Sequence, residues 1–185
     1  MRVITGIAKG HRLKAPKGLK TRPTTDRVKE SIFNILGSIS PDALILDLFS
    51  GSGNVGIEFL SRGGKECYFI DSGLQSIKTI NENLKNTRLN TKGQVYKNNV
   101  NRAIGALGNN NKRFDYIFMD PPYEKDLVIP TLEKIYKQEI LKKSGIIIIE
   151  HETKKILPDS LYNLIKFDMR NYGGTSVTFY SIEED

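Results

Sequence analysis

The stretch "ALILDLFSGSGNVGIEFLSR", residues 43–62, decides the fold. Its first seven residues are almost all apolar and predict a buried strand, whereas "NVGIEFLSR" predicts a helix that is ended by two glycines. Between them lies a glycine-rich turn, Gly51-x-Gly53-x-x-Gly56. A strand, a glycine turn and a helix in this order begin a βαβ unit, in which ligands bind at the carboxyl ends of the strands. We therefore expect a ligand site at this turn.

Strand and helix patterns continue to alternate after this unit. Strands are expected at 43–49, 66–71, 94–98, 114–120 and 145–151, and helices at 54–62, 72–86, 100–107 and 126–141. Ser72 and Gln75 form a capping-box pattern at the start of the second of these helices. The alternation predicts an α/β fold with a doubly wound parallel sheet. Two final strands, 164–172 and 175–182, meet at two glycines and predict a closing antiparallel hairpin.

The positive charge of the chain is concentrated at its N-terminus. The formal net charge is +7, yet residues 1–29 alone contain nine Lys or Arg against one acid, Asp26. Patterns in this part predict a short hairpin that turns at Lys9-Gly10 and a helix that starts near Thr24 and is capped by Thr25 or Asp26. We expect two parts: residues 1–40 as a basic RNA-binding extension packed on the main domain, residues 41–185.

Nucleic acid is the partner that this basic extension favours. Neutralising phosphates releases counterions, which favours binding whatever the base sequence. Residues 1–29 contain no Phe, Tyr or Trp, so we expect contact with the nucleic-acid backbone rather than stacking on bases. Arg12 and Lys14 are candidates for phosphate contact.

Other sequence features restrict the class of protein. No apolar run approaches the length of about 18 residues that a membrane span needs, and the first residues lack the apolar core of a signal peptide. A single cysteine, Cys67, excludes an internal disulfide, and two distant histidines predict no metal site. We expect a cytoplasmic monomer without membrane contact.

Charge indicates which ligand the glycine turn binds. Asp47 stands four residues before Gly51, where a carboxylate would repel the pyrophosphate of a dinucleotide but attract a cation. S-adenosylmethionine has an ammonium group and a sulfonium and no phosphate. Asp71 ends the second strand, the usual place of an acid that accepts from a ribose diol, although it could instead only cap the next helix. Asn99 is a candidate for the adenine edge, with Asn98 and a turn role as alternatives.

The motif Asp120-Pro121-Pro122-Tyr123 follows the fourth expected strand. A loop start would explain the two prolines, which fix the backbone, but neither Asp120 nor Tyr123. An exocyclic amine on a base is a poor nucleophile. If the Asp120 carboxylate and the Pro121 carbonyl accept its two hydrogens, its lone pair is directed at a methyl donor. Tyr123 could stack on a base that is flipped out of its helix.

These segments resemble the RsmD family, bacterial methyltransferases that modify the N2 amine of a guanine in small-subunit (16S) ribosomal RNA. The resemblance is carried by "MRVITGIAKGHRLKAPKG", "TRPTTDRVKESIFNIL", "DLFSGSGNVGIE", "DPPY" and "YGGTSVTFY". It implies a Rossmann-like class I methyltransferase fold with a seven-stranded, mostly parallel sheet, S-adenosylmethionine as donor, and a complete or partly assembled small subunit as substrate.

The resemblance also implies roles for individual residues. It gives Asp47, Phe49, Gly51 and Gly53 to the donor pocket, and Asp120, Pro121 and Tyr123 to the target base. It places Arg22 and Arg27 beside RNA at the mouth of the site. Relatives more often have Glu at the position of Asp71, whose shorter side chain still permits a ribose contact.

Two other functions stay open at this point. The same proline motif occurs in N6-adenine methyltransferases that act on DNA or on other RNA, because both amines carry two hydrogens. A donor-binding module in ribosome assembly, without catalysis, is the second. The basic extension and the absence of a sizeable DNA-recognition insert favour ribosomal RNA, and the presence of Asp120 and Tyr123 favours catalysis.

Overall fold

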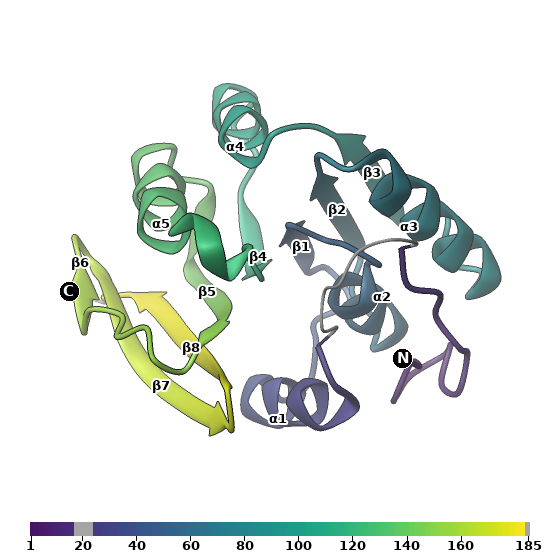
Figure 1. Ribbon diagram of the computed structural model, residues 1–185. Coiled ribbons are helices and arrows are strands. Elements are labelled where there is room, and N and C mark those ends of the chain that lie inside the picture. Colours follow the sequence, from purple (N-terminus) through teal and green to yellow (C-terminus); the bar gives the residue numbers. More distant parts are fainter. Residues whose placement is uncertain (17–23, 184–185) are drawn as a thin grey trace.

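The computed structural model describes residues 1–16 and 24–183. One eight-stranded sheet crosses the molecule in the order β3-β2-β1-β4-β5-β8-β7-β6, with helices on both faces (Figure 1). The strands are β1 (Leu44–Leu48), β2 (Glu66–Asp71), β3 (Gly93–Lys97), β4 (Phe114–Met119), β5 (Leu141–Glu152), β6 (Ser160–Leu161), β7 (Leu164–Tyr172) and β8 (Thr175–Ile182). The helices are α1 (Asp26–Leu36), α2 (Asn54–Ser61), α3 (Leu74–Asn86), α4 (Val100–Asn109) and α5 (Val128–Lys137).

The sheet confirms the predicted α/β class. Strands β1 to β5 are parallel to their neighbours, while β8 runs antiparallel to β5 and forms a hairpin with β7. Strand β6, only two residues long, pairs with β7 and adds one strand to the predicted set. Strand order reverses between β1 and β4, which creates the crevice where ligands bind in folds of this kind.

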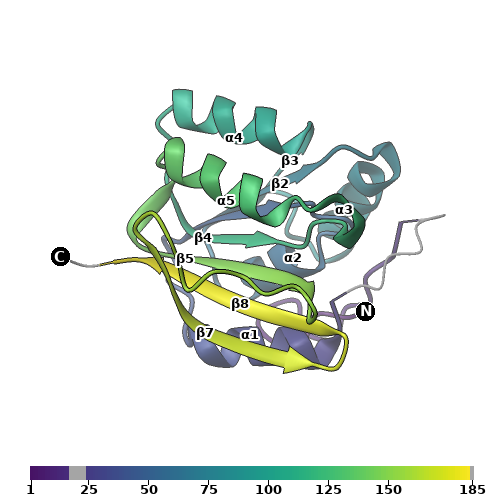
Figure 2. The same cartoon turned by 60° about the vertical axis from the view of Figure 1, so that its left-hand side comes forward.

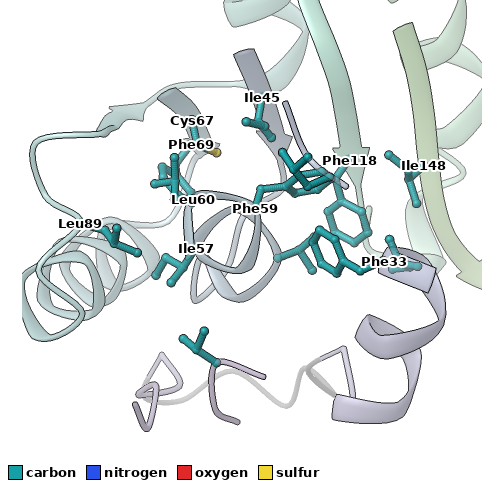
Figure 3. Packing of buried hydrophobic residues seen from close by; sticks show 14 of the residues in the cluster. Phe33, Ile45, Ile57, Phe59, Leu60, Cys67, Phe69, Leu89, Phe118 and Ile148 are labelled. Carbon is teal, nitrogen blue, oxygen red and sulfur yellow. The ribbon is translucent and has the colours of Figure 1, made fainter. Parts of the chain in front are cut away.

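Two hydrophobic cores hold the helices against the sheet. Helices α1, α2 and α3 cover one face, and α4 and α5 cover the other (Figures 1 and 2). In the first core Phe33 of α1 meets Phe59 of α2 edge to face, with ring centroids 4.7 Å apart, beneath Phe118 of β4 and Ile148 of β5 (Figure 3). Apolar side chains at i, i+3 and i+4 spacing bury one face of each helix and fix it in place.

The first residues form a hairpin-like loop closed by one antiparallel bridge between Arg2 and Arg12. Gly6 has a φ of 86°, and a Cβ there would lie 1.8 Å from the carbonyl oxygen of Ser61, so only glycine permits this close approach to α2. Thr25 caps α1 by accepting from the Val28 amide, as predicted. The N-terminal loop is therefore held against α2, where the Ile7 amide donates to the Ser61 carbonyl and the Ala8 amide donates to Ser61 Oγ.

A buried ion cluster fastens this loop, and we call it the Glu58 clamp: Glu58 of α2, Lys29 of α1 and Arg62. The Glu58 carboxylate accepts from Lys29 Nζ at 3.0 Å, from Arg62 Nε at 3.0 Å, and from the backbone amides of Ile4 and Thr5. Both Lys29 and Glu58 side chains are 0% exposed. Lys29, which counts toward the basic extension in the sequence, is thus unavailable to RNA.

Two local predictions were wrong. Helix α5 is shorter than residues 126–141, because Asp126 has a left-handed backbone with a φ of 45° and β5 already begins at Leu141. The capping box does not form, since Gly73 is the N-cap of α3 and no side chain caps it. Within residues 1–16 and 24–183, no helix combines the length and apolarity needed to cross a membrane.

Candidate active site

Acidic side chains gather where neighbouring strands end, at the crevice of the sheet. Pairing of Leu48 with Met119, and of Met119 with Ile149, sets Asp120 beside Glu150 and close to the end of β1. Side chains alternate along a strand, and Ile45, Phe118 and Ile148 all pack toward α1 and α2. Each of the acids Asp47, Asp120 and Glu150 lies two residues after one of these apolar residues, so all three face the same side of the sheet.

Asp47 lies beneath the glycine turn. It is 1% exposed, and its Oδ2 accepts from the Gly56 amide at 3.0 Å. Among the described residues its other oxygen, Oδ1, has no hydrogen-bond partner. Burial raises the pKa of Asp47 well above its usual range, and the Asp71 carboxylate raises it further. A buried, half-satisfied carboxylate is costly by itself, and a cation bound nearby would compensate for it.

Each position of the glycine turn requires glycine for a structural reason of its own. Gly51 and Gly53 have φ values of 55° and 75°, in the left-handed region that side chains disfavour. At Gly56 a Cβ would lie 2.3 Å from the Phe69 ring and 2.8 Å from Asp47 Oδ2, so any side chain would displace the carboxylate. The turn therefore brings backbone close to the carboxyl ends of β1 and β2 with no side chains in the way.

Asp71 connects the turn to the next helix. Its Oδ2 accepts from the Gly51 amide at 2.9 Å and its Oδ1 accepts from the Gly73 amide at 2.7 Å. The two alternatives from the sequence are therefore not exclusive, because a carboxylate has about four lone-pair positions and two of them remain for a ribose diol. The Asp71 carboxylate thus also holds the amide of Gly73, the N-cap residue of α3.

We expect Asp71→Ala to weaken S-adenosylmethionine binding. Loss of charge-assisted bonds of about 1.5–3 kcal/mol predicts an affinity loss of roughly tenfold to a hundredfold. Titration calorimetry measures this directly. Ser72→Ala is the matched control, because Ser72 makes no cap bond to α3. An Asp71→Ala affinity equal to that of the wild type would restrict Asp71 to a structural role.

Two other residues that were predicted to contact S-adenosylmethionine, Asn99 and Phe49, also have local structural roles. Asn99 is the N-cap of α4, and its carboxamide oxygen accepts from the Asn101 and Arg102 amides at 3.0 and 3.4 Å. This leaves its amino group as the part that could contact an adenine. Phe49 follows β1 with a φ of 58° and is partly buried against the core on the side of α4 and α5.

The proline motif begins where β4 ends. Pro121 is buried, whereas Tyr123 is 45% exposed and its hydroxyl lies 3.4 Å from that of Thr175 in β8. Burial raises the pKa of Asp120 well above its usual range, and the carboxylates of Glu150 and Asp47 raise it further. Burial also raises the pKa of Tyr123 to about 12, so its hydroxyl stays protonated even at alkaline pH. Asp120 is thus a stronger base than a surface carboxylate.

The three predicted RNA residues that the structure describes lie at two separate places. Arg12 and Lys14 are exposed on the N-terminal loop beside α3, where Lys14 Nζ pairs with Glu82 at 2.9 Å. Arg27 is exposed at the start of α1 and lines a cavity next to β5 and β8. Arg22 lies outside the described residues.

The sequence did not reveal the roles of Glu150 and Thr24. Thr24 Oγ1 donates to Glu150 Oε2 at 2.6 Å, and its carbonyl accepts from Asn54 Nδ2 at 3.0 Å. Thr24 thus connects the end of β5 to the first residue of α2, directly after the glycine turn. One feature of the sequence could have indicated Glu150: it is an acid directly after the apolar run "GIIII", where a strand ends at the ligand edge of the sheet.

Comparisons with known proteins agree with this geometry. The family model described as conserved hypothetical protein 95 matches residues 1–181. "Putative rRNA methyltransferase YlbH" of Bacillus subtilis is 43% identical over 180 residues, 97% of this chain and 98% of that protein. Ribosomal RNA small subunit methyltransferase D of Escherichia coli K12 is 31% identical over 158 residues, 85% of this chain and 78% of that protein.

A solved structure has the same fold. "Putative methyltransferase yhhF from Escherichia coli" superimposes with a TM-score of 0.87 and 30% identity, covering 99% of this chain and 98% of that chain. This similarity confirms the predicted methyltransferase fold. The chain belongs to the family described as conserved hypothetical protein 95, as its resemblance to the RsmD family predicted.

Proposed function

We propose that this protein transfers a methyl group from S-adenosylmethionine to the N2 amine of a guanine in small-subunit ribosomal RNA. One observation carries the proposal: Asp120 and the proline motif lie at the same sheet edge as the glycine turn and Asp47. The names of the relatives in Bacillus subtilis and Escherichia coli support RNA of the ribosome as substrate.

The residues present fit the donor. Bound S-adenosylmethionine supplies a methyl group on a positively charged sulfur. The orphaned Oδ1 of Asp47 and the raised pKa of this group both indicate a place where a cation is stabilising. Asp71 has lone pairs left for a ribose, and the glycine turn leaves backbone uncovered beside it. Phe49, Gly53 and Asn99 complete the proposed donor pocket.

Chemistry on the amine needs acceptors rather than a nucleophile. The Asp120 carboxylate and the Pro121 carbonyl accept the two N2 hydrogens, which draws the nitrogen toward a tetrahedral shape and frees its lone pair. When the nitrogen gains a methyl group, one of its protons passes to Asp120, whose raised pKa favours this step. Tyr123, neutral and half exposed, presents a ring face for the flipped base.

Transfer of a labelled methyl group tests this function. Small subunits that lack the modification are incubated with the protein and S-adenosylmethionine, next to deproteinised RNA from the same particles. We expect label in the small-subunit RNA of the particles. Absence of transfer to both substrates would leave the non-catalytic donor-binding module as the better account.

The basic extension, residues 1–40, is proposed to bind RNA phosphates while residues 41–185 bind the donor. We expect joint replacement of Arg12, Lys14 and Arg22 by Gln to weaken RNA binding and to lower the slope of log affinity against log salt by roughly one unit for each lost contact. Filter binding across a salt series measures both effects.

The matched control for this variant replaces three lysines outside the extension, Lys134 and Lys137 on α5 and Lys143 on β5. It removes the same charge and should keep the slope close to that of the wild type. Equal slopes for the two variants would remove the phosphate role of the extension.

A further inference from the structure

A second stretch of the chain is strongly basic. Residues 83–114 contain seven Lys or Arg and no Asp or Glu, whereas the chain outside this stretch and residues 1–29 has 12 bases against 20 acids. The stretch runs from the end of α3 through β3 and α4 to the first residue of β4. Because β3 is the outermost strand on its side of the sheet, these residues form one edge of the molecule (Figure 1).

Most of the basic side chains of this stretch are exposed and uncompensated. In the part of the chain that the structure describes, five of them are exposed and make no ion pair: Lys85, Arg88, Lys97, Arg102 and Lys112. We call these five residues together with Tyr96 the β3 edge surface. Glu66, an acid on the neighbouring strand β2, accepts from Gln94 Nε2 at 2.9 Å. Exposed charges of one sign attract a polyanion.

The β3 edge surface is continuous with the N-terminal loop. Asn83 of α3 accepts from the Lys14 amide at 2.8 Å and donates to the Lys14 carbonyl at 3.0 Å, and Asn86 donates to the Arg12 carbonyl at 3.0 Å. The two basic residues at the end of α3 lie beside these contacts, between the loop and β3 (Figure 1). A strand of RNA that binds the loop can therefore continue along this edge.

Tyr96 gives this edge an aromatic ring. Tyr96 is 46% exposed on β3 and stacks on Tyr68 of β2, with ring centroids 6.0 Å apart and planes inclined by 20°. Lys112 Nζ lies 5.6 Å from the centroid of the same Tyr68 ring. Arg102 is exposed in the first turn of α4, directly after the loop that leaves β3. Cations therefore stand near both ends of α4, with a stacked and exposed ring on the strand beside it.

We propose that the β3 edge surface binds a single-stranded segment of the substrate RNA, in which Tyr96 stacks on an unpaired base and the cations contact phosphates. Proteins that hold single strands combine these two kinds of contact. The surface reaches the donor site, because Lys97 pairs with Asp71 in the sheet register. The inference rests on the proposed function and adds the stacking contact that residues 1–29, without Phe, Tyr or Trp, do not offer.

Removal of the charges tests the phosphate contacts. Filter binding of deproteinised small-subunit RNA is measured across a salt series for a variant with Lys97, Arg102 and Lys112 replaced by Gln. We expect weaker binding and a slope of log affinity against log salt that is lower by roughly one unit for each lost contact. The three-lysine control described for the extension serves here as well and should keep the wild-type slope.

Removal of the ring tests the stacking contact. Tyr96→Leu keeps an apolar side chain on Tyr68, and we expect the affinity for the same RNA to fall about fivefold to a hundredfold. The salt slope should stay unchanged, since stacking releases no counterions. Tyr96→Phe should bind like the wild type. Tyr162→Leu is the matched control, because Tyr162 is also exposed and stacks on Tyr136, with ring centroids 4.4 Å apart.

The outcomes separate this surface from the function on which it rests. Methyl transfer to small subunits is measured on the same wild-type preparation, and its absence would refute the proposed function. With transfer intact, an unchanged slope for the Gln variant would overturn the phosphate contacts, and an unchanged affinity of Tyr96→Leu would overturn the stacking contact. Both results together would leave the charges only the role of protecting an exposed edge strand. Thermal melting identifies a variant that is not folded, and the other variant then decides.

Discussion

Asp120→Ala is expected to lower turnover at least about a hundredfold, the usual effect of losing one polarising contact in a transition state. S-adenosylmethionine affinity should stay nearly unchanged, because Asp71 ends β2 and the glycine turn follows β1, whereas Asp120 follows β4. Single-turnover kinetics and titration calorimetry measure the two quantities on the same preparation. A reduction in affinity alone, with unchanged turnover, would contradict the mechanism.

The pH profile adds a second readout of Asp120. Its carboxylate form accepts the amine hydrogen and its acid form does not accept a proton, so the methyl-transfer rate should rise with pH as Asp120 deprotonates. Because burial and the nearby acids raise its pKa, this rise should lie above the range of an ordinary aspartate. In Asp120→Ala this rise of the rate with pH should be absent. Asp42→Ala, at an exposed acid beside β1, is the matched control and should keep the wild-type profile.

Glu58→Ala is expected to have the largest effect on stability. It leaves Lys29 as an unpaired buried charge, and breaking such pairs typically lowers the free energy of unfolding by about 3–5 kcal/mol. It also removes the acceptors of the Ile4 and Thr5 amides, so the N-terminal loop loses its attachment to α2. Urea unfolding measures the change in free energy.

Glu30→Ala is the matched control for the clamp, because Glu30 lies on α1 one residue after Lys29 but is exposed. It should unfold within about 0.5 kcal/mol of the wild type. Equal stability of the two variants would show that the Glu58 clamp does not hold the N-terminal loop. A destabilised Glu58→Ala protein should also show a weaker salt dependence of RNA binding.

Local patterns predicted the parts of the site that depend on a few adjacent residues. The strand before Gly51, the turn itself and the proline motif each need a short run of suitable residues, and the structure has them at one sheet edge. The closing hairpin was predicted to the residue at both strands, since alternation and the glycine pair mark its ends.

Contacts between distant residues could not be predicted in the same way. Lys29 looks like a surface charge until α2 brings Glu58 against it, a pairing across 29 positions. The capping box was wrong because α3 begins one residue later than predicted, with Gly73 as its N-cap and the Gly73 amide bound to Asp71 of the preceding strand. Glu150 is an unremarkable acid in the sequence, and only the packing of α1 against β5 and β8 makes it the wall of a cavity.

Identification of the methylated nucleoside tests the central claim most directly. Small subunits lacking the modification are treated with the protein and labelled S-adenosylmethionine, and their RNA is digested to nucleosides for mass spectrometry. The account predicts label in N2-methylguanosine, absent from a reaction with Asp120→Ala. Label in N6-methyladenosine would contradict the proposed function.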